Sequence, residues 1–463
     1  MSSSKKQSKA TKFLASYSCW DYKFNKKIRD KFKNISKIFL TKDALIDYEF
    51  IIKVTNKAKK LHYIYLIIMF IIGSTILDSI FDILIFSTLN VEQRIYSDYN
   101  TPSESEAIIL IMFFLSFIIT FIYDFLRHKN ISSILNDNEI EKIDTSNYRI
   151  PNNEQNICIF SGIKPFIGSG IIYKNSSFVI SIDKVKALML NKSSIIDFSE
   201  DEIYDFIQNS LSKNYSNISQ KLYINGTLLN NDTNLLSAID TGKLSKEVWE
   251  EYSKQNNNAI RRYICITNVS ESEEVQTNFF IRFSKQQNNT LFVEITATIL
   301  PPVSNLYRTI DQLPKKISFT RFILISQTSI LSSIINVFKS FFYGLGFILS
   351  IKEKIFGENI VRTQIKENPL FDYGEKSTLR EDISNTSFET FYNFMDEQQL
   401  SKQIEKSFFT HFIKFLDSKN IDTFELTQQE TTIINHGLIM SGGEFKAENM
   451  AVGKRSSIFG AKK

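Results

Sequence analysis

Cysteine and histidine are scarce in this sequence, and their spacing excludes several classes of protein. The chain of 463 residues has three cysteines, Cys19, Cys158 and Cys265, which lie far apart and form no CxxC pair. An odd, scattered set of this kind argues against a disulfide framework and a zinc site, and it indicates a reducing compartment. The four histidines form no HExxH or HxxxH motif, so a histidine-bound metal is not expected.

Catalytic motifs are missing as well. No GxSxG elbow occurs, and Gly168 and Gly170 in IKPFIGSG lack the third glycine and the lysine of a phosphate-binding loop. A tight turn is the simpler interpretation. The acids of FDYGEKSTLRED admit a paired-carboxylate site, but a solvated loop with a turn at Tyr373 and Gly374 is favoured. We therefore expect no cofactor, and an enzyme is the less favoured hypothesis.

Glycine (15) and proline (7) are sparse, whereas phenylalanine (40) is abundant. Apolar residues concentrate in two runs, Leu61 to Leu89 and Ala107 to Leu126, separated by an acidic connector, Asn90 to Glu106. A helix needs about 20 mainly apolar residues to cross a hydrocarbon core about 30 Å thick. The runs therefore predict a two-helix transmembrane hairpin within residues 61–129.

Charges beside the hairpin predict its orientation. Lysines precede the first run, and Arg127 and Lys129 follow the second, whereas the connector has Arg94 as its one basic residue against four acids. The positive-inside rule then places both termini in the cytoplasm. The predicted location is the inner (plasma) membrane. The polar stretch before Trp20 has no apolar core of a cleaved signal peptide.

Two acids in the first run have two interpretations. Asp78 and Asp82 are four residues apart and share a helical face, so they are candidates for a proton relay or a cation pathway. However, Asp78 lies about 25 Å along a helix that enters the bilayer at Leu61, which is near the outer headgroups. The boundary position is the favoured interpretation.

Residues 1–60 form a basic region with sixteen Lys or Arg residues against five acids. Between Trp20 and Leu40, apolar residues recur at helical spacing with basic residues between them, which predicts a basic amphipathic helix. An interfacial helix that contacts anionic lipids is the favoured interpretation, and packing on the cytosolic domain is the alternative. The candidate lipid contacts are Lys23, Lys26, Lys27, Arg29, Lys31, Lys33 and Lys37.

Residues 150–317 predict a cytosolic α+β domain. Ser199 and Glu202 have capping-box spacing at the start of a helix that continues to about Leu211, and a second helix is expected from Leu244 to Tyr252. Alternating residues predict an antiparallel meander whose other face, with Arg282 and Glu294, meets solvent. The expected strands are Asn156 to Phe160, Ile171 to Ile182, Ala259 to Val269, Val275 to Phe283 and Thr290 to Leu300.

Residues 318–430 predict a helical region that is possibly membrane-associated. Phe322 to Phe338 carries no charge but is short and rich in Ser, Thr, Asn and Gln. A helix buried in the cytosolic body or lying against the bilayer is favoured over a third span. Phe388 to Leu416 has the apolar stripe of an amphipathic helix.

Residues 431–463 predict a short β-rich segment and a basic tail. Small apolar runs alternate with glycines, so homotypic strand stacking and a capping hairpin are both open. The candidate self-association residues are Ile434, Ile439, Phe445 and Val452.

Several phrases resemble a known group of proteins. They are IKPFIGSG, RRYICITNV, FFIRF, LFVEITATILPP, NPLFDYGEKSTLRE and TTIINHGLIMSGGEFKAENMAVG. Their order resembles uncharacterised bacterial membrane proteins of actinobacterial type, with an N-terminal membrane hairpin and a cytosolic remainder. The glycine-rich ending also resembles terminal β segments of bacterial conflict and defence proteins.

The sequence thus predicts a membrane α-hairpin followed by a cytosolic α+β domain with an antiparallel sheet and a short C-terminal β segment. The favoured function is a non-enzymatic signalling, sensing or assembly protein, anchored in the bilayer and possibly homo-oligomeric, with a role in bacterial conflict or defence. An oligomeric channel or membrane-disrupting effector is the alternative. A hydrolase or nucleotide-binding enzyme comes third, and no nucleic-acid partner is expected.

Overall fold

The chain divides into two compact units. The helical unit comprises residues 1–36, 47–149 and 307–368, and the sheet unit comprises residues 37–46, 150–306 and 369–463. The structure is a computed structural model. It describes residues 7–33, 37–89, 102–137, 145–152, 154–183, 195–255, 259–270, 275–313, 318–339, 363, 368, 370–385, 391–424 and 426–427.

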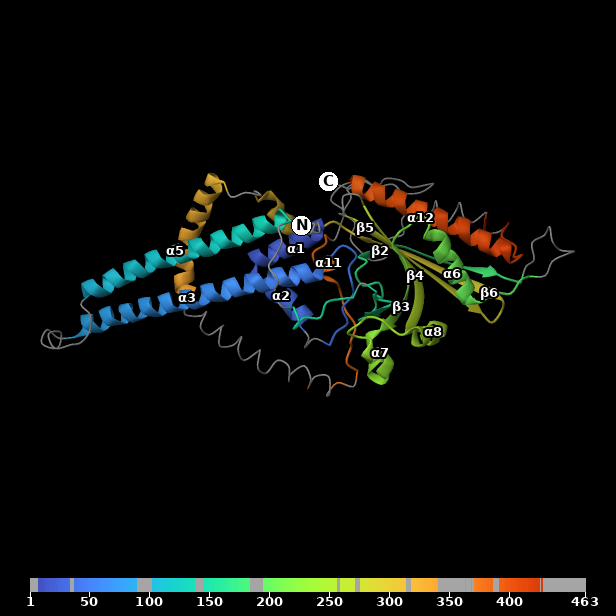
Figure 1. Ribbon diagram of the computed structural model, residues 1–463, viewed down its shortest axis with the longest axis horizontal. Helices are drawn as coiled ribbons and strands as arrows, with labels where there is room; N and C mark the ends of the chain where they lie inside the picture. Colours follow the sequence, from blue (N-terminus) through green and yellow to red (C-terminus); the bar gives the residue numbers. More distant parts are fainter. Residues whose placement is uncertain are drawn as a thin grey trace, which may run out of the picture. The chain divides into compact units, whose positions relative to one another are not determined.

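Two long helices dominate the helical unit and run side by side in opposite directions (Figure 1). They are α3 (Tyr48–Thr88) and α5 (Pro102–Leu135), which contain the two apolar runs. Asp47 begins α3 as an N-cap, because its carboxylate accepts a hydrogen bond of 3.0 Å from the Phe50 N–H. The apolar runs are therefore helical, as predicted.

The predicted basic helix is present but shorter than expected. α1 (Lys9–Trp20) and α2 (Tyr22–Phe32) are separated at Asp21, which caps α2. Phe24, Ile28 and Phe32 of α2 are buried, and α2 packs on α1 and α3. The apolar stripe of α2 is therefore occupied by neighbouring helices within the unit.

A third apolar helix, Phe319–Lys339, belongs to the helical unit as well. It follows two short helical turns, α9 (Asn305–Arg308) and η3 (Thr309–Gln312). The helix covers the stretch for which the sequence left a third span open.

The sheet unit contains a six-stranded sheet in the order β1-β3-β4-β5-β6-β2. Strands β3 to β6 and β2 pair in antiparallel fashion, whereas β1 pairs with β3 in parallel, so the sheet is mixed and not purely antiparallel as predicted. The strands are β1 (Ile157–Phe160), β2 (Ile171–Ser181), β3 (Ile218–Asn225), β4 (Ile260–Val269), β5 (Gln276–Gln286) and β6 (Thr290–Leu300).

One face of the sheet packs on two helices, α6 (Glu200–Leu211) and α12 (Phe391–Ser418). Ser199 and Glu202 form the predicted capping box at the start of α6. The remaining helices of the unit are short: η2 (Gly226–Asn231), α7 (Thr233–Ser237), α8 (Lys246–Lys254) and α11 (Leu379–Asp382). The apolar layer between the sheet and the two longer helices, α6 and α12, explains why every second residue of the strands is apolar.

The other face of the sheet does not meet solvent as predicted. Gln276, Asn278 and Thr298 are at most 6% exposed, and the side chains of Arg282 and Glu294 are each 14% exposed. Residues outside the strands, including Phe166 and Ile167, cover this face, where they pack on an aromatic cluster with Tyr223, Tyr263 and Phe280. Beside that cluster lie mostly buried polar side chains, which we call the polar layer: Thr267, Gln276, Asn278 and Thr298. The expected C-terminal β segment, with Ile434, Ile439, Phe445 and Val452, lies outside the described residues.

Candidate functional site

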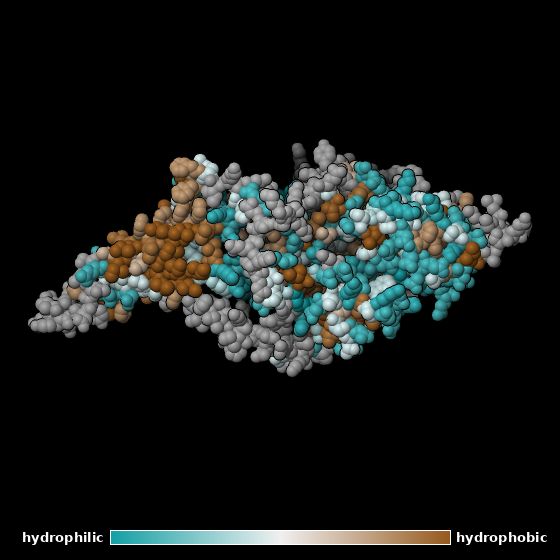
Figure 2. Space-filling view, viewed as in Figure 1, coloured by the Kyte–Doolittle hydropathy of each residue, from teal (hydrophilic) through white to brown (hydrophobic). Residues whose placement is uncertain are grey.

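Three helices are long and apolar enough to cross a membrane: α3, α5 and the third apolar helix. Each exposes large apolar side chains, including Ile71 (57%), Phe114 (66%) and Leu331 (65%). Figure 2 shows a continuous hydrophobic surface over the α3–α5 hairpin. Apolar surface of this extent is unusual on a water-soluble protein and is typical of contact with lipid or another apolar surface.

Side-chain contacts fix the register of the hairpin. The Tyr65 and Thr120 hydroxyls are 3.3 Å apart, and the Tyr65 ring stacks on Tyr123 with centroids separated by 4.2 Å. Asp78 follows Tyr65 by thirteen residues in α3, and Ala107 precedes Thr120 by thirteen residues in α5. Because both helices rise equally per residue, Asp78 lies at the level where the apolar run of α5 begins.

The two predicted membrane acids therefore lie at one end of the apolar hairpin, in the register with Glu104 and Glu106 of α5. Asp78 is exposed and Asp82 is half-buried. The boundary interpretation of Asp78 and Asp82 stays a prediction. A proton or cation pathway through Asp78 and Asp82 remains an untested prediction.

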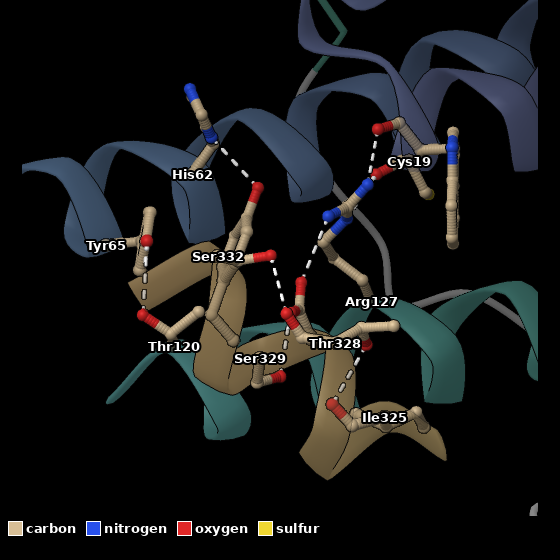
Figure 3. A network of polar contacts seen from close by, with 12 residues as sticks. Cys19, His62, Tyr65, Thr120, Arg127, Ile325, Thr328, Ser329 and Ser332 are labelled. Carbon is tan, nitrogen blue, oxygen red and sulfur yellow. Dashed lines mark hydrogen bonds and ion pairs between the residues drawn. The ribbon is translucent and has the colours of Figure 1, made fainter. Parts of the chain in front are cut away.

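A different acid forms the polar centre of the helical unit. The Asp124 carboxylate of α5 accepts a 2.9 Å hydrogen bond from the Ser329 hydroxyl of the third apolar helix and pairs with Arg127 at 3.1 Å. Arg127 also donates to the backbone carbonyls of Cys19 (3.2 Å) and Trp20, at the end of α1 (Figure 3). We call this set the polar junction.

The polar junction joins three chain segments by charge-assisted contacts. Side chains of Asp124 and Arg127 are 17% and 19% exposed, so solvent competes little with their pairing. Asn336, further along the third helix, donates a 2.8 Å hydrogen bond to the Tyr65 hydroxyl. The third helix is thus attached to both helices of the hairpin by polar side chains.

Hydroxyl groups that made the third helix look too polar for a membrane have partners. Ser329 and Ser333 are buried, and Ser333 donates to the Ile330 carbonyl. Ser326 and Ser332 likewise donate to backbone carbonyls of the preceding turn. Satisfied hydroxyls carry a much smaller burial cost than free ones, so their number does not exclude an apolar environment.

The third helix crosses the hairpin steeply and does not run along it (Figure 1). Phe322 packs edge-to-face on Phe121 with ring centroids 5.1 Å apart, and Asn336, fourteen residues later, bonds to Tyr65 at the level of Thr120. Fourteen residues span about 21 Å of helix axis, whereas the contacted part of α5 spans about 6 Å. The axes therefore cannot be parallel.

The predicted lipid-contacting side chains are placed differently from one another. Lys23, Lys26 and Lys27 are exposed on α2. Arg29 is 3% exposed and donates a 2.7 Å hydrogen bond to Asn25, so it serves packing within the unit. Lys31 and Lys33 are half-buried, and Lys37 is exposed in the sheet unit, after the end of α2.

The IKPFIGSG segment forms a turn that binds one of the chain's own carboxylates. Gly168 and Gly170 have positive φ angles of 81° and 85°, and a Cβ on Gly170 would lie 2.2 Å from the Ile299 carbonyl oxygen. The Gly170 N–H donates a 2.9 Å hydrogen bond to Glu381. Glu381 thus occupies a donor that a phosphate would need, in agreement with the tight-turn interpretation.

The FDYGEKSTLRED block is not a solvated loop. Residues 370–385, which we call the clasp, include Glu375 (3% exposed) and Arg380 (1% exposed). Glu375 pairs through its backbone with β1 and accepts a 2.6 Å hydrogen bond from the Thr41 N–H. Arg380 donates a 2.8 Å bond to the Pro301 carbonyl. These contacts hold three distant segments of the sheet unit together, so the acids are structural.

The three cysteine thiols are buried and have low reactivity. Burial raises the pKa of Cys19, Cys158 and Cys265 to about 12, 12 and 11, so these thiols stay protonated near neutral pH. Within the part of the chain that the structure describes, no group of three or more His, Cys, Asp or Glu residues is arranged to hold a metal.

These features define an α+β protein with three apolar helices of membrane-spanning length and a mixed six-stranded sheet. The model of the AbeC-like domain matches residues 180–447, which is 268 of the 463 residues. The chain therefore belongs to the AbeC-like domain family, a bacterial abortive-infection-type family. Comparisons with curated proteins and with solved structures give no match.

The match gives the predicted link to bacterial defence a family basis and covers most of the phrases on which the resemblance rested. It contains the β4 to β6 meander, the third apolar helix, the clasp and α12, whereas the α3–α5 hairpin precedes it.

Proposed function

We propose that this chain is a non-enzymatic, membrane-anchored component of bacterial abortive-infection-type defence. Its helical unit inserts into the inner membrane and keeps the sheet unit on the cytoplasmic side. The exposed apolar surface of the helical unit, together with its internal polar junction, carries the proposal. That arrangement suits lipid, where polar groups must find partners inside the protein.

In this proposal, the hairpin crosses the bilayer with the connector 90–106 outside. The level of Asp124 and Arg127 marks the inner boundary, and the level of Asp78 marks the outer one. The exposed Lys23, Lys26 and Lys27 of α2 face anionic headgroups on the cytoplasmic side. The family's link to abortive infection supports the defence role, in which the sheet unit senses or relays a signal.

Reporter fusions test this topology. Alkaline phosphatase inserted after Asn100 should be active, because that enzyme works outside the cytoplasm, and green fluorescent protein fused after Lys463 should fluoresce. Alkaline extraction should leave the full-length protein in the membrane pellet. An inactive phosphatase at position 100, or release of the protein by alkali, would contradict the proposal.

The third apolar helix lies in the plane of the inner leaflet and does not cross the bilayer as a third span. Its steep crossing of the hairpin at the levels of Thr120 to Asp124 supports this placement, since those residues lie near the inner end of the apolar run.

Depth measurements distinguish the two placements. Leu331 and Phe114 are both exposed, so each is replaced by a cysteine with a bimane label in full-length protein reconstituted in vesicles. Lipids brominated near the headgroup should quench the label at 331 better, and lipids brominated near the chain ends should quench the label at 114 better. Equal deep quenching at both positions would show a spanning third helix.

A further inference from the structure

The polar layer of the sheet is unusual for a protein interior. Asn278 of β5 accepts hydrogen bonds from Thr267 (3.0 Å) and Gln276 (2.9 Å), and it donates to the Ser169 carbonyl (3.3 Å) and to Thr298 (3.4 Å). Buried amides stabilise a fold poorly compared with apolar side chains, and departures from an apolar core are concentrated at functional sites. This face of the sheet is therefore a candidate for a ligand site.

A cavity of about 310 Å³ opens over this layer, within the sheet unit. Its lining includes polar side chains of the sheet, residues 41–44 and 167–169, Lys221 and Tyr223 of β3, and the aromatic side chain of Phe280. Ligand pockets in proteins start at about 300 Å³. The cavity therefore has room for one metabolite-sized molecule.

Charge in the cavity favours an anion. Lys221 lines it, and among the described residues no carboxylate lies within ion-pair distance of its ammonium group. Lys42 lies on the wall and donates to the Ile46 carbonyl. The one acid in the lining, Asp43, is 4% exposed and accepts a hydrogen bond from the Arg380 N–H of the clasp. Lys221 is thus the group most available to a ligand's negative charge.

Polar side chains in the lining of the cavity can form hydrogen bonds with a ligand. Gln276 uses its amide N–H on Asn278, which leaves its carbonyl oxygen as an acceptor beside the cavity. Cys158 and Cys265 also belong to the lining, and their thiols already contact Thr41 and Tyr223, respectively. The lining thus combines the ammonium groups of Lys221 and Lys42 and the carboxylate of Asp43 with neutral hydrogen-bonding groups and with apolar side chains such as Phe280.

We propose that this cavity binds a small organic anion of metabolite size, whose carboxylate or phosphate pairs with Lys221 and whose polar body hydrogen-bonds to Gln276 and its neighbours. The site rests on the sheet unit alone. It goes beyond the proposed function, because membrane insertion plays no part in its geometry.

Binding is measured by calorimetry and thermal unfolding on full-length protein in detergent, with two probes. Adenosine monophosphate represents the phosphates and citrate represents the carboxylates. We expect one of them to bind and raise the Tm. Lys221→Gln should weaken that binding at least tenfold, whereas Lys221→Arg, which keeps the charge, should retain most of it.

Lys164→Gln is the matched control, because Lys164 is exposed near the cavity but does not line it. Gln276→Leu should weaken binding by a smaller factor and serves as a second variant if Lys221→Gln fails to fold. The site is refuted if neither probe binds the wild type, or if Lys221→Gln and Lys164→Gln bind equally well. Alkaline extraction of the same preparations tests membrane insertion separately, so either idea can fail alone.

Discussion

The helical unit and the sheet unit distribute polarity in opposite ways. Apolar side chains cover the outside of the α3–α5 hairpin, and its polar side chains meet inside, around Asp124. In the sheet unit, apolar side chains fill the layer between the sheet and α6 and α12, and exposed positions are mostly polar. The same physical rule, that buried polar groups need partners, is satisfied inside the helical unit by contacts between its own side chains.

Both units also bury charge, but they neutralise it differently. Asp124 and Arg127 lie three residues apart on one helix, so the pair forms locally and then recruits the third helix. In the sheet unit, Lys174 of β2 pairs with Glu405 of α12 at 2.8 Å, across 231 residues of sequence. Local pairs tolerate change in the rest of the fold, whereas the distant pair depends on correct docking of α12.

The largest effect is expected from charge on the outer surface of the hairpin. Leu110→Lys with Phe114→Lys places two lysines on exposed positions of α5. A lysine costs about 2.5–3.5 kcal/mol at the middle of a membrane helix, so the cost is greater at position 114 than at position 110, which lies one turn from the outer boundary. The alkali-resistant fraction of the protein should fall severalfold. Ile163→Lys with Val179→Lys, at exposed positions of the sheet unit, should leave it unchanged. An equal loss of the alkali-resistant fraction in both double variants would show that the exposed surfaces of the hairpin and of the sheet unit do not differ in this respect.

A second large effect is expected at the buried pair of the sheet unit. Lys174→Met leaves Glu405, which is 2% exposed, without its partner, and loss of one member of such a pair costs about 3–5 kcal/mol. The Tm should fall by several degrees. Lys243→Met, which removes the partner of the 71% exposed Glu154, should cost about 0–1 kcal/mol. Lys174→Met with Glu405→Leu should recover most of the loss.

The same variant predicts a pH dependence. Burial raises the pKa of Glu405, and Lys174 opposes that rise. Without Lys174 the folded-state pKa rises further above the unfolded value, so Glu405 favours folding when protonated and loses this contribution as pH rises through its folded-state pKa. The Tm deficit of Lys174→Met relative to wild type should therefore shrink as the pH is lowered from 8 towards 5. A deficit independent of pH would contradict this account.

An intermediate effect is expected at the polar junction. Asp124→Ala leaves Ser329 and Arg127 without their shared acceptor, at a cost of about 1–3 kcal/mol. A disulfide between Phe121→Cys and Phe322→Cys should then form more slowly, because the third helix docks less firmly. Asp78→Asn with Asp82→Asn, outside the junction, should leave the rate unchanged. An unaffected rate in Asp124→Ala would show that docking does not need the junction.

The smallest effect is expected for Ser329→Ala. Hydrogen bonds between membrane helices average about 0.6 kcal/mol, so cross-linking of the same cysteine pair should slow by about a factor of three. Ser326→Ala is the matched control on the same helix, because Ser326 is half-buried and donates to the Ile323 carbonyl of its own helix. A larger effect at Ser326 than at Ser329 would contradict the role of the Ser329 hydroxyl in docking the third helix.

Local patterns in the sequence predicted many of the elements, because those elements depend on neighbouring residues. Strand β6 begins and ends at the expected residues, and the Ser199 capping box is formed as its spacing indicated. Strand β3 was missed, because Ser219, Gln220 and Lys221 interrupt the apolar alternation. Lys221 lines the cavity, so one of the polar residues that obscured the strand pattern belongs to the candidate ligand site.

Contacts between distant segments could not be predicted from single residues. Asp124 and Ser329 are 205 residues apart, and in the sequence Asp124 is a single acid near the end of an apolar run. The buried state of the clasp was equally hidden, since its acids have partners on β1 and in residues 41–43. Parallel pairing of β1 with β3 depends on such long-range docking too, and it made the sheet mixed.

The contact between Glu381 and Gly170 places a built-in competitor at the glycine turn. A tethered group acts at an effective concentration of about millimolar or more, depending on its linker. Glu381 is also held by the capping box of α11, which orders it further. A free anion at micromolar concentration would therefore not displace Glu381 from the Gly170 N–H. Anions that reach the sheet unit are left to the neighbouring cavity, where Lys221 has no such rival among the described residues.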